Sequence, residues 1–178
     1  MDYNSIAISG LPGSGKGTLN KLLSEHFGWA SHSVGDYIRE MHRQDPQKCS
    51  MPFPTYWKQM SVEENRSIDQ EIARRVAEGG VVIDGRYIHI FQPETFKIFI
   101  TASLTGRASR VPESKRLGKD HLGVMEILKQ READEMAMGK ALYGADYDYR
   151  EPIHYNLILD SDILTPQKEL QEVLKVLV

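Results

Sequence analysis

Apolar residues recur along the chain with two different spacings, and their alternation predicts the order of the elements. Short apolar runs at 6–8, 81–83, 96–100 and 157–159 are typical of parallel strands buried on both faces. Residues 30–33 form a shorter strand candidate. Segments with helical spacing of leucine, isoleucine and valine lie between these runs. Because strands alternate with helices, we expect an α/β fold in which a five-stranded parallel sheet is flanked by helices.

Start and stop residues set the limits of the predicted helices. The first helix ends at Gly28, a C-terminal stop signal, and Asp36 caps the next one. Ser61 is followed three residues later by a glutamate, which is the pattern of a capping box. Pro166 begins the last helix. Residues 47–54 carry no periodic apolar pattern and are predicted to be a loop.

A glycine-rich segment follows the first strand and precedes the first helix. Its glycines allow backbone N–H groups to approach phosphate oxygens, and its lysine adds a positive charge over the β- and γ-phosphates. The N-terminus of the following helix favours the same anion. A turn that is glycine-rich for packing alone is the alternative, but the position of the lysine favours phosphate. We therefore expect a nucleoside triphosphate site made of Gly10, Leu11, Pro12, Gly13, Ser14, Gly15, Lys16, Gly17 and Thr18.

Length and composition narrow the class of protein. The chain has 178 residues, enough for one domain with a good core, and a formal net charge of −3. No overall basic field is present, so nucleic acid binding is not indicated. The single cysteine, Cys49, excludes an internal disulfide. We find no secretion signal and no apolar run long enough to span a membrane, so a cytoplasmic location is expected.

Arginines stand near the ends of the predicted strands and in the loops. Guanidinium groups bind phosphate oxygens in a planar fork, so a phosphoryl-transfer site needs several of them, although each alone is also compatible with an ordinary surface position. Residues 107–122 are basic and contain proline and glycine, which favours a lid over the phosphates; a solvated basic loop is the alternative. The candidates are Arg39, Arg86, Arg107, Arg110, Arg116 and Arg131.

Four segments resemble nucleoside monophosphate kinases of the adenylate and cytidylate type. They are Gly-Lys-Gly-Thr at 15–18, Ser33 to Arg39, Asp-Gly-Arg at 84–86, and Gln-Arg-Glu at 130–132. Over nearly its whole length the chain resembles the cytidylate-kinase-like members of the P-loop nucleoside monophosphate kinase family. The resemblance implies one P-loop kinase domain over residues 1–178, with a mobile acceptor-binding segment at about 37–78 and a short lid at about 107–122.

The resemblance also implies roles for single residues. Lys16, Arg86 and Arg131 are the expected catalytic residues, and Arg107, Arg110 and Arg116 are expected to join the loop in binding ATP. The acceptor monophosphate is expected to be bound by Ser33, Asp36, Arg39, Arg86 and Arg131. Mg²⁺ would be held by Thr18 and by Asp84, directly or through water; pairing of Asp84 with Lys16 is the alternative.

The expected reaction is ATP-dependent phosphorylation of a nucleoside monophosphate, with CMP or dCMP as the acceptor. Two alternatives stay open. One is a kinase of the same fold acting on AMP or another small phosphorylated metabolite. The other is a non-catalytic nucleotide-binding regulatory module, suggested because Tyr87-Ile88-His89 and Met138 depart from the family pattern. The aromatic residues of 53–57 either wall the base pocket or anchor a loop. A monomer is the simplest expected state.

Overall fold

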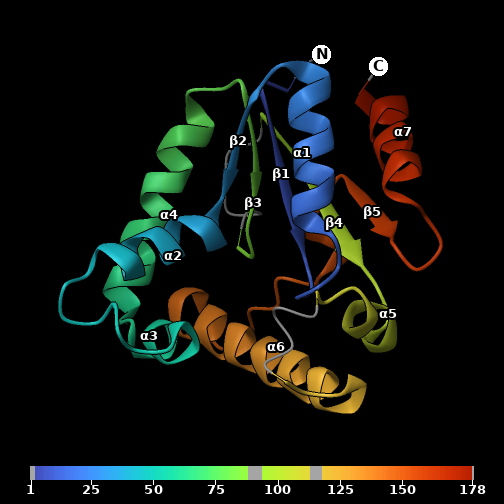
Figure 1. Ribbon diagram of the computed structural model, residues 1–178. Helices are drawn as coiled ribbons and strands as arrows, with labels where there is room; N and C mark the ends of the chain where they lie inside the picture. Colours follow the sequence, from blue (N-terminus) through green and yellow to red (C-terminus); the bar gives the residue numbers. More distant parts are fainter. Residues whose placement is uncertain (1–2, 88–93, 113–117, 178) are drawn as a thin grey trace.

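A sheet of five strands forms the centre of the molecule (Figure 1), in the order β2-β3-β1-β4-β5. The structure is a computed structural model that describes residues 3–87, 94–112 and 118–177. All four strand pairings are parallel, which confirms the fold predicted from the sequence. The strands are β1 (Ser5–Gly10), β2 (Ala30–Ser33), β3 (Val81–Asp84), β4 (Thr95–Thr101) and β5 (Leu157–Asp160).

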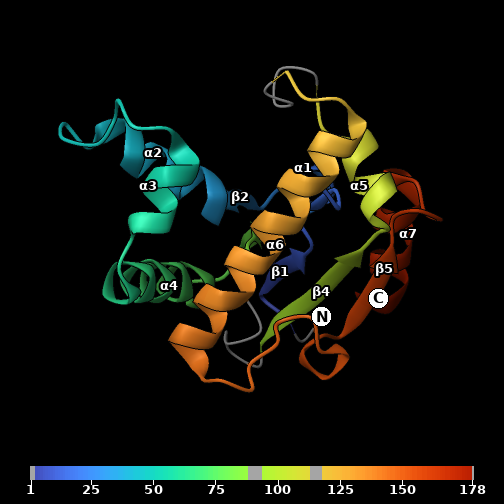
Figure 2. The same ribbon diagram turned by 90° about the horizontal axis from the view of Figure 1, so that it is seen from below.

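Helices cover both faces of the sheet and its carboxyl end. In Figure 1, α1 and α7 lie on one side, α2 and α4 on the other, and α6 runs below the ends of the strands. Figure 2, seen from below, shows α6 crossing the whole carboxyl end of the sheet. The helices are α1 (Lys16–Phe27), α2 (Val34–Gln44), α3 (Phe53–Gln59), α4 (Val62–Ala77), α5 (Leu104–Ser109), α6 (His121–Tyr143) and α7 (Pro166–Leu177), with the 3₁₀ turn η3 (Pro152–His154) before β5.

Two hydrophobic cores result from the alternation of side chains along the central strands. In β1, Ile6 and Ile8 point into the core beneath α1 and α7, whereas Ala7 points into the core beneath α2, α3 and α4. In β3, Val82 joins the first core and Ile83 the second. All five side chains are fully buried. Successive strand residues face opposite sides, so a strand covered on both faces must be apolar at every position, as these runs are.

Most predicted helix limits are confirmed. Gly28 ends α1 in the left-handed conformation with φ +66°, and Pro166 is the first residue of α7. Ser61 and Glu64 form the expected capping box at the start of α4, with the backbone N–H of Glu64 donating to the Ser61 hydroxyl and that of Ser61 donating to the Glu64 carboxylate. These local rules held because each depends on residues within one turn.

Two local predictions were wrong. Asp36 does not cap α2: the helix begins at Val34, and the hydroxyl of Ser33 accepts the backbone N–H of Asp36 at 3.4 Å. A serine one position before the helix competes well for this role. The predicted loop at 47–54 runs into helix α3, which begins at Phe53. Seven residues are too few to show helical periodicity.

Candidate active site

The glycine-rich segment forms a tight turn between β1 and α1. An added Cβ at Gly10 would lie 2.4 Å from the carbonyl oxygen of Ile100 in β4, so the chain can leave the sheet here only without a side chain. Gly15 is the N-cap of α1 with φ +101°, a conformation that strains other residues. The turn therefore carries its backbone to the N-terminus of a twelve-residue helix, the arrangement that favours a bound phosphate.

Lys16 is folded over this turn. Its Nζ donates to the carbonyl oxygens of Gly10 at 2.7 Å and Leu11 at 3.0 Å. The pKa of Lys16 is lowered from 10.5 to about 8, chiefly by burial; the charge of Glu135 opposes this shift and that of Arg131 adds to it. The ammonium group is thus held among groups that stabilise it only in part. An anion such as phosphate would restore the missing stabilisation.

Asp84 lies at the end of β3, next to the end of β2 and to α1. Its Oδ1 accepts the hydroxyl of Ser33, and its Oδ2 accepts the side-chain amide of Asn20, both at 3.0 Å. Burial raises the pKa of Asp84, and the nearby charge of Lys16 opposes that shift. No ion pair joins Asp84 and Lys16 among the described residues, although their charges interact. The two strand ends and α1 therefore meet at one fixed carboxyl group.

Arg86 and Arg131 converge on one carboxylate. Glu135 of α6 is 1 % exposed, and its Oε1 lies 2.9 Å from Nε of Arg131 and 3.7 Å from Nε of Arg86. The guanidinium of Arg86 also stacks over the ring of Trp57, with its Cζ 4.5 Å from the ring centroid. Two of the predicted catalytic residues, Arg86 just after β3 and Arg131 in α6, are therefore brought together beside Lys16, the third.

The other predicted arginines are placed differently. Arg107 lies in α5 and is 4 % exposed; it donates to the carbonyl oxygen of Pro12 at 3.2 Å and pairs with Glu132 at 3.1 Å. Arg110 donates to the Ser161 hydroxyl at 2.7 Å. Arg107 thus supports the phosphate-binding turn from below, and only its role in binding ATP stays a prediction. Arg116 lies outside the described residues.

Arg39 extends from α2, on the acceptor side. Its Nη1 pairs with Asp36 at 2.6 Å, and its guanidinium lies 5.3 Å from the ring centroid of Phe53. A Cβ on Gly35 would come within 3.3 Å of the same guanidinium. These contacts keep Arg39 within α2 and α3, so the structure does not bring it to Lys16. Its role as an acceptor ligand remains a prediction.

Comparisons with known proteins agree with this geometry. The family model described as AAA domain matches residues 9–102. The cytidylate kinase of Methanopyrus kandleri is 34 % identical over 88 % of this chain and 83 % of its own. That of Methanocaldococcus jannaschii is 30 % identical over 88 % of this chain and 87 % of its own. The chain belongs to the cytidylate kinase family. The family predicted from the four short segments is therefore confirmed.

Solved structures support the fold of this cytidylate kinase family member. The shikimate kinase of Bacteroides thetaiotaomicron matches with a TM-score of 0.61 at 18 % identity, covering 97 % of each chain. This likeness concerns the fold alone. No helix in the described part of the chain is both long enough and apolar enough to cross a membrane.

A magnesium ion in this kinase would have few protein ligands. Within the described ranges, no three His, Cys, Asp or Glu side chains are grouped to hold a metal. Mg²⁺ commonly takes only one or two protein oxygens and completes its shell with water and substrate phosphates. The buried carboxyl of Asp84 and the exposed hydroxyl of Thr18, in the first turn of α1, suit that mode. The residues present therefore fit a metal held mainly by the nucleotide.

Sequence reasoning missed two groups of the site. They are Glu135 of α6 and Asn20 of α1, neither of which is among the candidates that the sequence analysis names. Both stand four positions after a site residue, Arg131 and Lys16, so the i, i+4 spacing was an available signal. Met138, which departs from the family pattern, packs half-buried in the tyrosine-rich core around Tyr149. It is thus part of the packing beneath the site.

Proposed function

We propose that the protein transfers the γ-phosphoryl group of ATP to CMP or dCMP, giving ADP and the nucleoside diphosphate. The observation that supports this most strongly is the meeting of Lys16, Arg86 and Arg131 around Glu135 at the carboxyl end of the sheet. Phosphoryl transfer needs positioning and neutralisation of charge more than covalent help. Three cations from three parts of the chain, beside the phosphate-binding turn, supply this positioning and this neutralisation of charge. The named relatives add the nature of the acceptor.

The donor side of the proposed reaction uses the turn at 10–18. Its backbone amides and Lys16 hold the β- and γ-phosphates of ATP, and the amino end of α1 adds its partial positive charge. Mg²⁺, held by Thr18 and Asp84 with the phosphates, supplies further neutralisation of charge. Arg107 keeps the turn in shape from α5 through its bond to the Pro12 carbonyl.

The acceptor side uses the ends of β2 and β3 and helix α2. Arg86 and Arg131 exchange their contact with Glu135 for contacts to the transferred and acceptor phosphates, which places positive charge where the transition state develops negative charge. Arg39, released from Asp36, clamps the acceptor phosphate, with Ser33 at the base of the same helix. A water molecule in place of the acceptor would hydrolyse ATP, so closure of the site is part of the proposal.

The same proposal includes the organisation of the chain. We treat residues 1–178 as one kinase domain with an acceptor segment at about 37–78 and a lid at about 107–122. The first three residues of the lid range lie in α5 and the last two in α6. A monomer in the cytoplasm, with ATP and a nucleoside monophosphate as its partners, completes the proposal.

The test is ADP release from purified protein with Mg-ATP and CMP, dCMP, UMP, AMP, GMP or no acceptor. We expect strong stimulation by CMP or dCMP. Lys16→Ala should abolish turnover, while Lys21→Ala, which removes an exposed lysine of the same helix paired only with Glu25, should not. Stimulation by AMP alone would show that AMP, and not CMP or dCMP, is the acceptor. ATP binding with no acceptor-dependent ADP would favour a regulatory nucleotide-binding module, and normal turnover in Lys16→Ala would overturn the proposal.

A further inference from the structure

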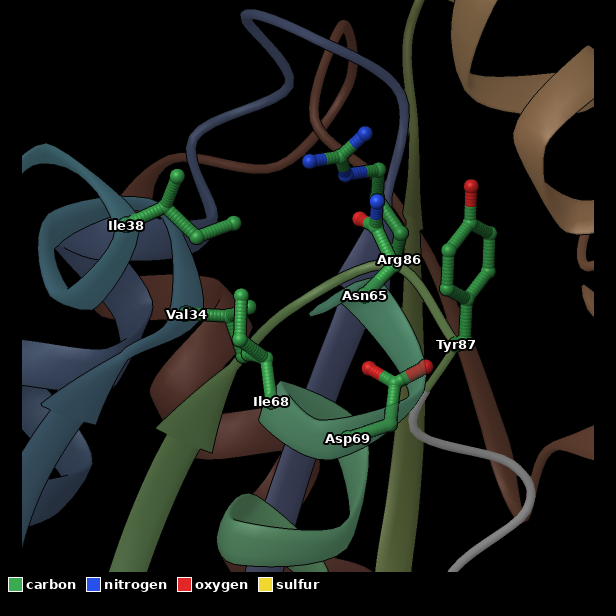
Figure 3. A pocket seen from close by; sticks show the side chains of 7 residues that line it. All are labelled: Val34, Ile38, Asn65, Ile68, Asp69, Arg86 and Tyr87. Carbon is green, nitrogen blue, oxygen red and sulfur yellow. The ribbon is translucent and has the colours of Figure 1, made fainter. Parts of the chain in front are cut away.

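The guanidinium of Arg86 lies in a confined place on the acceptor side. Figure 3 shows Arg86 and Tyr87 extending from the chain after β3, with Asp69 of α4 beside them. The cavity that these residues help to line measures about 20 Å³, which is room for about one water molecule. Asp69 is held there by the hydroxyl of Tyr143 in α6, which donates to its Oδ2. The Arg86 side chain, 15 % exposed, therefore has little freedom to move on this side.

The face of this guanidinium lies against an aromatic ring. Cζ of Arg86 is 4.5 Å from the ring centroid of Trp57 and 5.8 Å from that of Tyr87. Its ion pair with Glu135 is looser, since the 3.7 Å between Nε and Oε1 exceeds the length of a hydrogen bond. A stacked guanidinium uses its face for the ring and keeps its N–H edges available to bind phosphate oxygens in a fork. Trp57 can thus fix the plane of Arg86 without occupying its donors.

Trp57 is itself fixed between two parts of the fold. It lies in α3, is 8 % exposed, and belongs to the core beneath α2, α3 and α4. The next residue, Lys58, pairs with Asp134 of α6 at 2.8 Å. The buried Nε1 of Trp57 has no hydrogen-bond partner among the residues that the structure describes. Packing therefore holds the ring, and the ring offers Arg86 its aromatic face rather than its N–H group.

We propose that Trp57 is a positioning residue, whose ring keeps the guanidinium of Arg86 in the plane that phosphoryl transfer needs. The inference rests on the proposed function, in which Arg86 exchanges Glu135 for the phosphates. Because stacking uses the face of the guanidinium, the contact with the ring persists during this exchange. A group that is oriented in advance loses less entropy when the transition state forms. Trp57 lies within residues 37–78, so the predicted acceptor segment also orients the arginine that neutralises the acceptor phosphate.

A purely structural role for Trp57 would be to fill the core beneath α2, α3 and α4. Its replacement would then lower stability, and would change kcat by the same factor whether or not residue 86 carries a guanidinium. In a positioning role, loss of the ring matters only while the guanidinium of Arg86 is there to stack on it. Two residues that act through one contact have non-additive effects. A double-mutant cycle on kcat therefore separates the two roles.

The experiment measures kcat and KM with the monophosphate that stimulates wild type most. The variants are Trp57→Phe, Trp57→Leu, Arg86→Lys and the double variant Trp57→Leu/Arg86→Lys. Trp57→Leu should lower kcat about tenfold, as loss of a desolvated cation–π contact would, with the KM for ATP unchanged within about twofold. Trp57→Phe keeps an aromatic face and should restore kcat to within about threefold of wild type. In Arg86→Lys, whose ammonium group has no plane to orient, the change of Trp57 to leucine should lower kcat by less than about twofold.

The matched control is Trp29→Leu, the same change at the other tryptophan of the chain. Trp29 stacks on Phe27 and packs against the core beneath α1 and α7, away from Arg86. This variant loses packing of the same kind, and its kcat should stay within about twofold of wild type because distant sites act independently. A loss of kcat as large as in Trp57→Leu would assign the effect to packing in general and overturn the inference.

The remaining outcomes bear on different statements. No stimulation of wild type by any monophosphate would defeat the proposed function, and this inference with it. Stimulation of wild type with an unchanged kcat in Trp57→Leu would overturn this inference alone. So would equal losses of kcat from Trp57→Leu with Arg86 and with lysine at position 86, or a Trp57→Phe as slow as Trp57→Leu. Where Trp57→Leu does not fold, as judged by its thermal transition, Trp57→Met is measured instead against the same criteria.

Discussion

Oε1 of Glu135 lies 2.9 Å from Nε of Arg131, one helical turn away in α6, and the glutamate is 1 % exposed. The same oxygen is 3.7 Å from Nε of Arg86, and the charge of Glu135 also raises the pKa of Lys16. One buried negative charge thus stands among three cations that belong to different elements. It keeps them close together before any phosphate does, since their mutual repulsion would otherwise separate them.

Glu135→Gln tests this arrangement. Removing one partner of a buried charge cluster typically costs 3–5 kcal/mol, and because Arg131 is half-exposed we expect about 3 kcal/mol here. Inorganic phosphate should restore part of the lost stability, because the anion replaces the missing charge. The measurement is the thermal transition of both proteins with and without phosphate. We expect a larger upward shift with phosphate in Glu135→Gln than in wild type.

The matched control is Glu126→Gln on the same helix. Glu126 pairs with Lys129 at the surface, and both side chains are more than half exposed. Exposed pairs of this kind contribute little, so the variant should behave as wild type with and without phosphate. An equal phosphate shift in wild type and Glu135→Gln would show that Glu135 does not hold the three cations together.

The low pKa of Lys16 predicts a pH dependence of ATP binding. In the free protein Lys16 loses its proton near pH 8, and only the charged form attracts the phosphates. ATP affinity should therefore be constant below that pH and fall above it, by up to about tenfold per unit for one coupled proton. Titration calorimetry at several pH values measures this. Lys16→Met should bind weakly with no such break, and a break of equal size in Lys16→Met would assign it to another group.

Arg107 supplies a third prediction. Arg107→Met keeps the buried stem but loses the bond to the Pro12 carbonyl and the pair with Glu132. Because the turn would lose its support, we expect the KM for ATP to rise about tenfold and the protein to lose about 1–3 kcal/mol, as when a buried partner is left unpaired. Steady-state kinetics and denaturant unfolding measure the two effects. Arg74→Met, an exposed arginine of α4, is the control. An unchanged KM would refute the supporting role.

The features that the sequence predicted correctly each depend on a short stretch of chain. Four apolar runs and the short segment 30–33 became the five strands, and Ser61 with its glutamate became a capping box, because burial and capping depend on neighbouring residues. The phosphate-binding turn was found for the same reason, since all its parts stand within nine residues. Its neighbours in space were not found, because Glu135, which α6 brings to the site, stands 49 residues beyond Arg86 in the sequence.

The candidate site shows where such reasoning fails. The contact of Asp69 with Tyr143 joins residues 74 positions apart, and nothing local marks either one. Arg107 stands at the start of the predicted lid range, and nothing local shows that the packing of α5 against α6 buries it. Asp36 was expected to cap a helix that Ser33 caps instead, since the two residues compete for one N-terminus. Long-range packing decides the first two, and only the folded chain contains it, whereas the cap of α2 is a local competition.

Glu169 of α7 gives a prediction about stability rather than catalysis. It is 2 % exposed, and burial raises its pKa from 4.5 to about 7, with the charge of Arg110 opposing the shift. A carboxyl whose folded pKa is raised favours the native state while it is neutral. Its contribution is complete below about pH 4.5 and is lost as the pH rises from there through 7.

Glu169→Gln removes this dependence while keeping the shape of the side chain. At pH 5 the variant should unfold close to the wild-type temperature, and at pH 8 it should unfold several degrees higher, since 1 kcal/mol corresponds to about 2–4 °C for a chain of this size. Glu172→Gln, which removes an exposed carboxylate of the same helix paired with Lys175, should show no such difference. Equal melting of Glu169→Gln and wild type at pH 8 would mean that Glu169 ionises without cost in the folded protein.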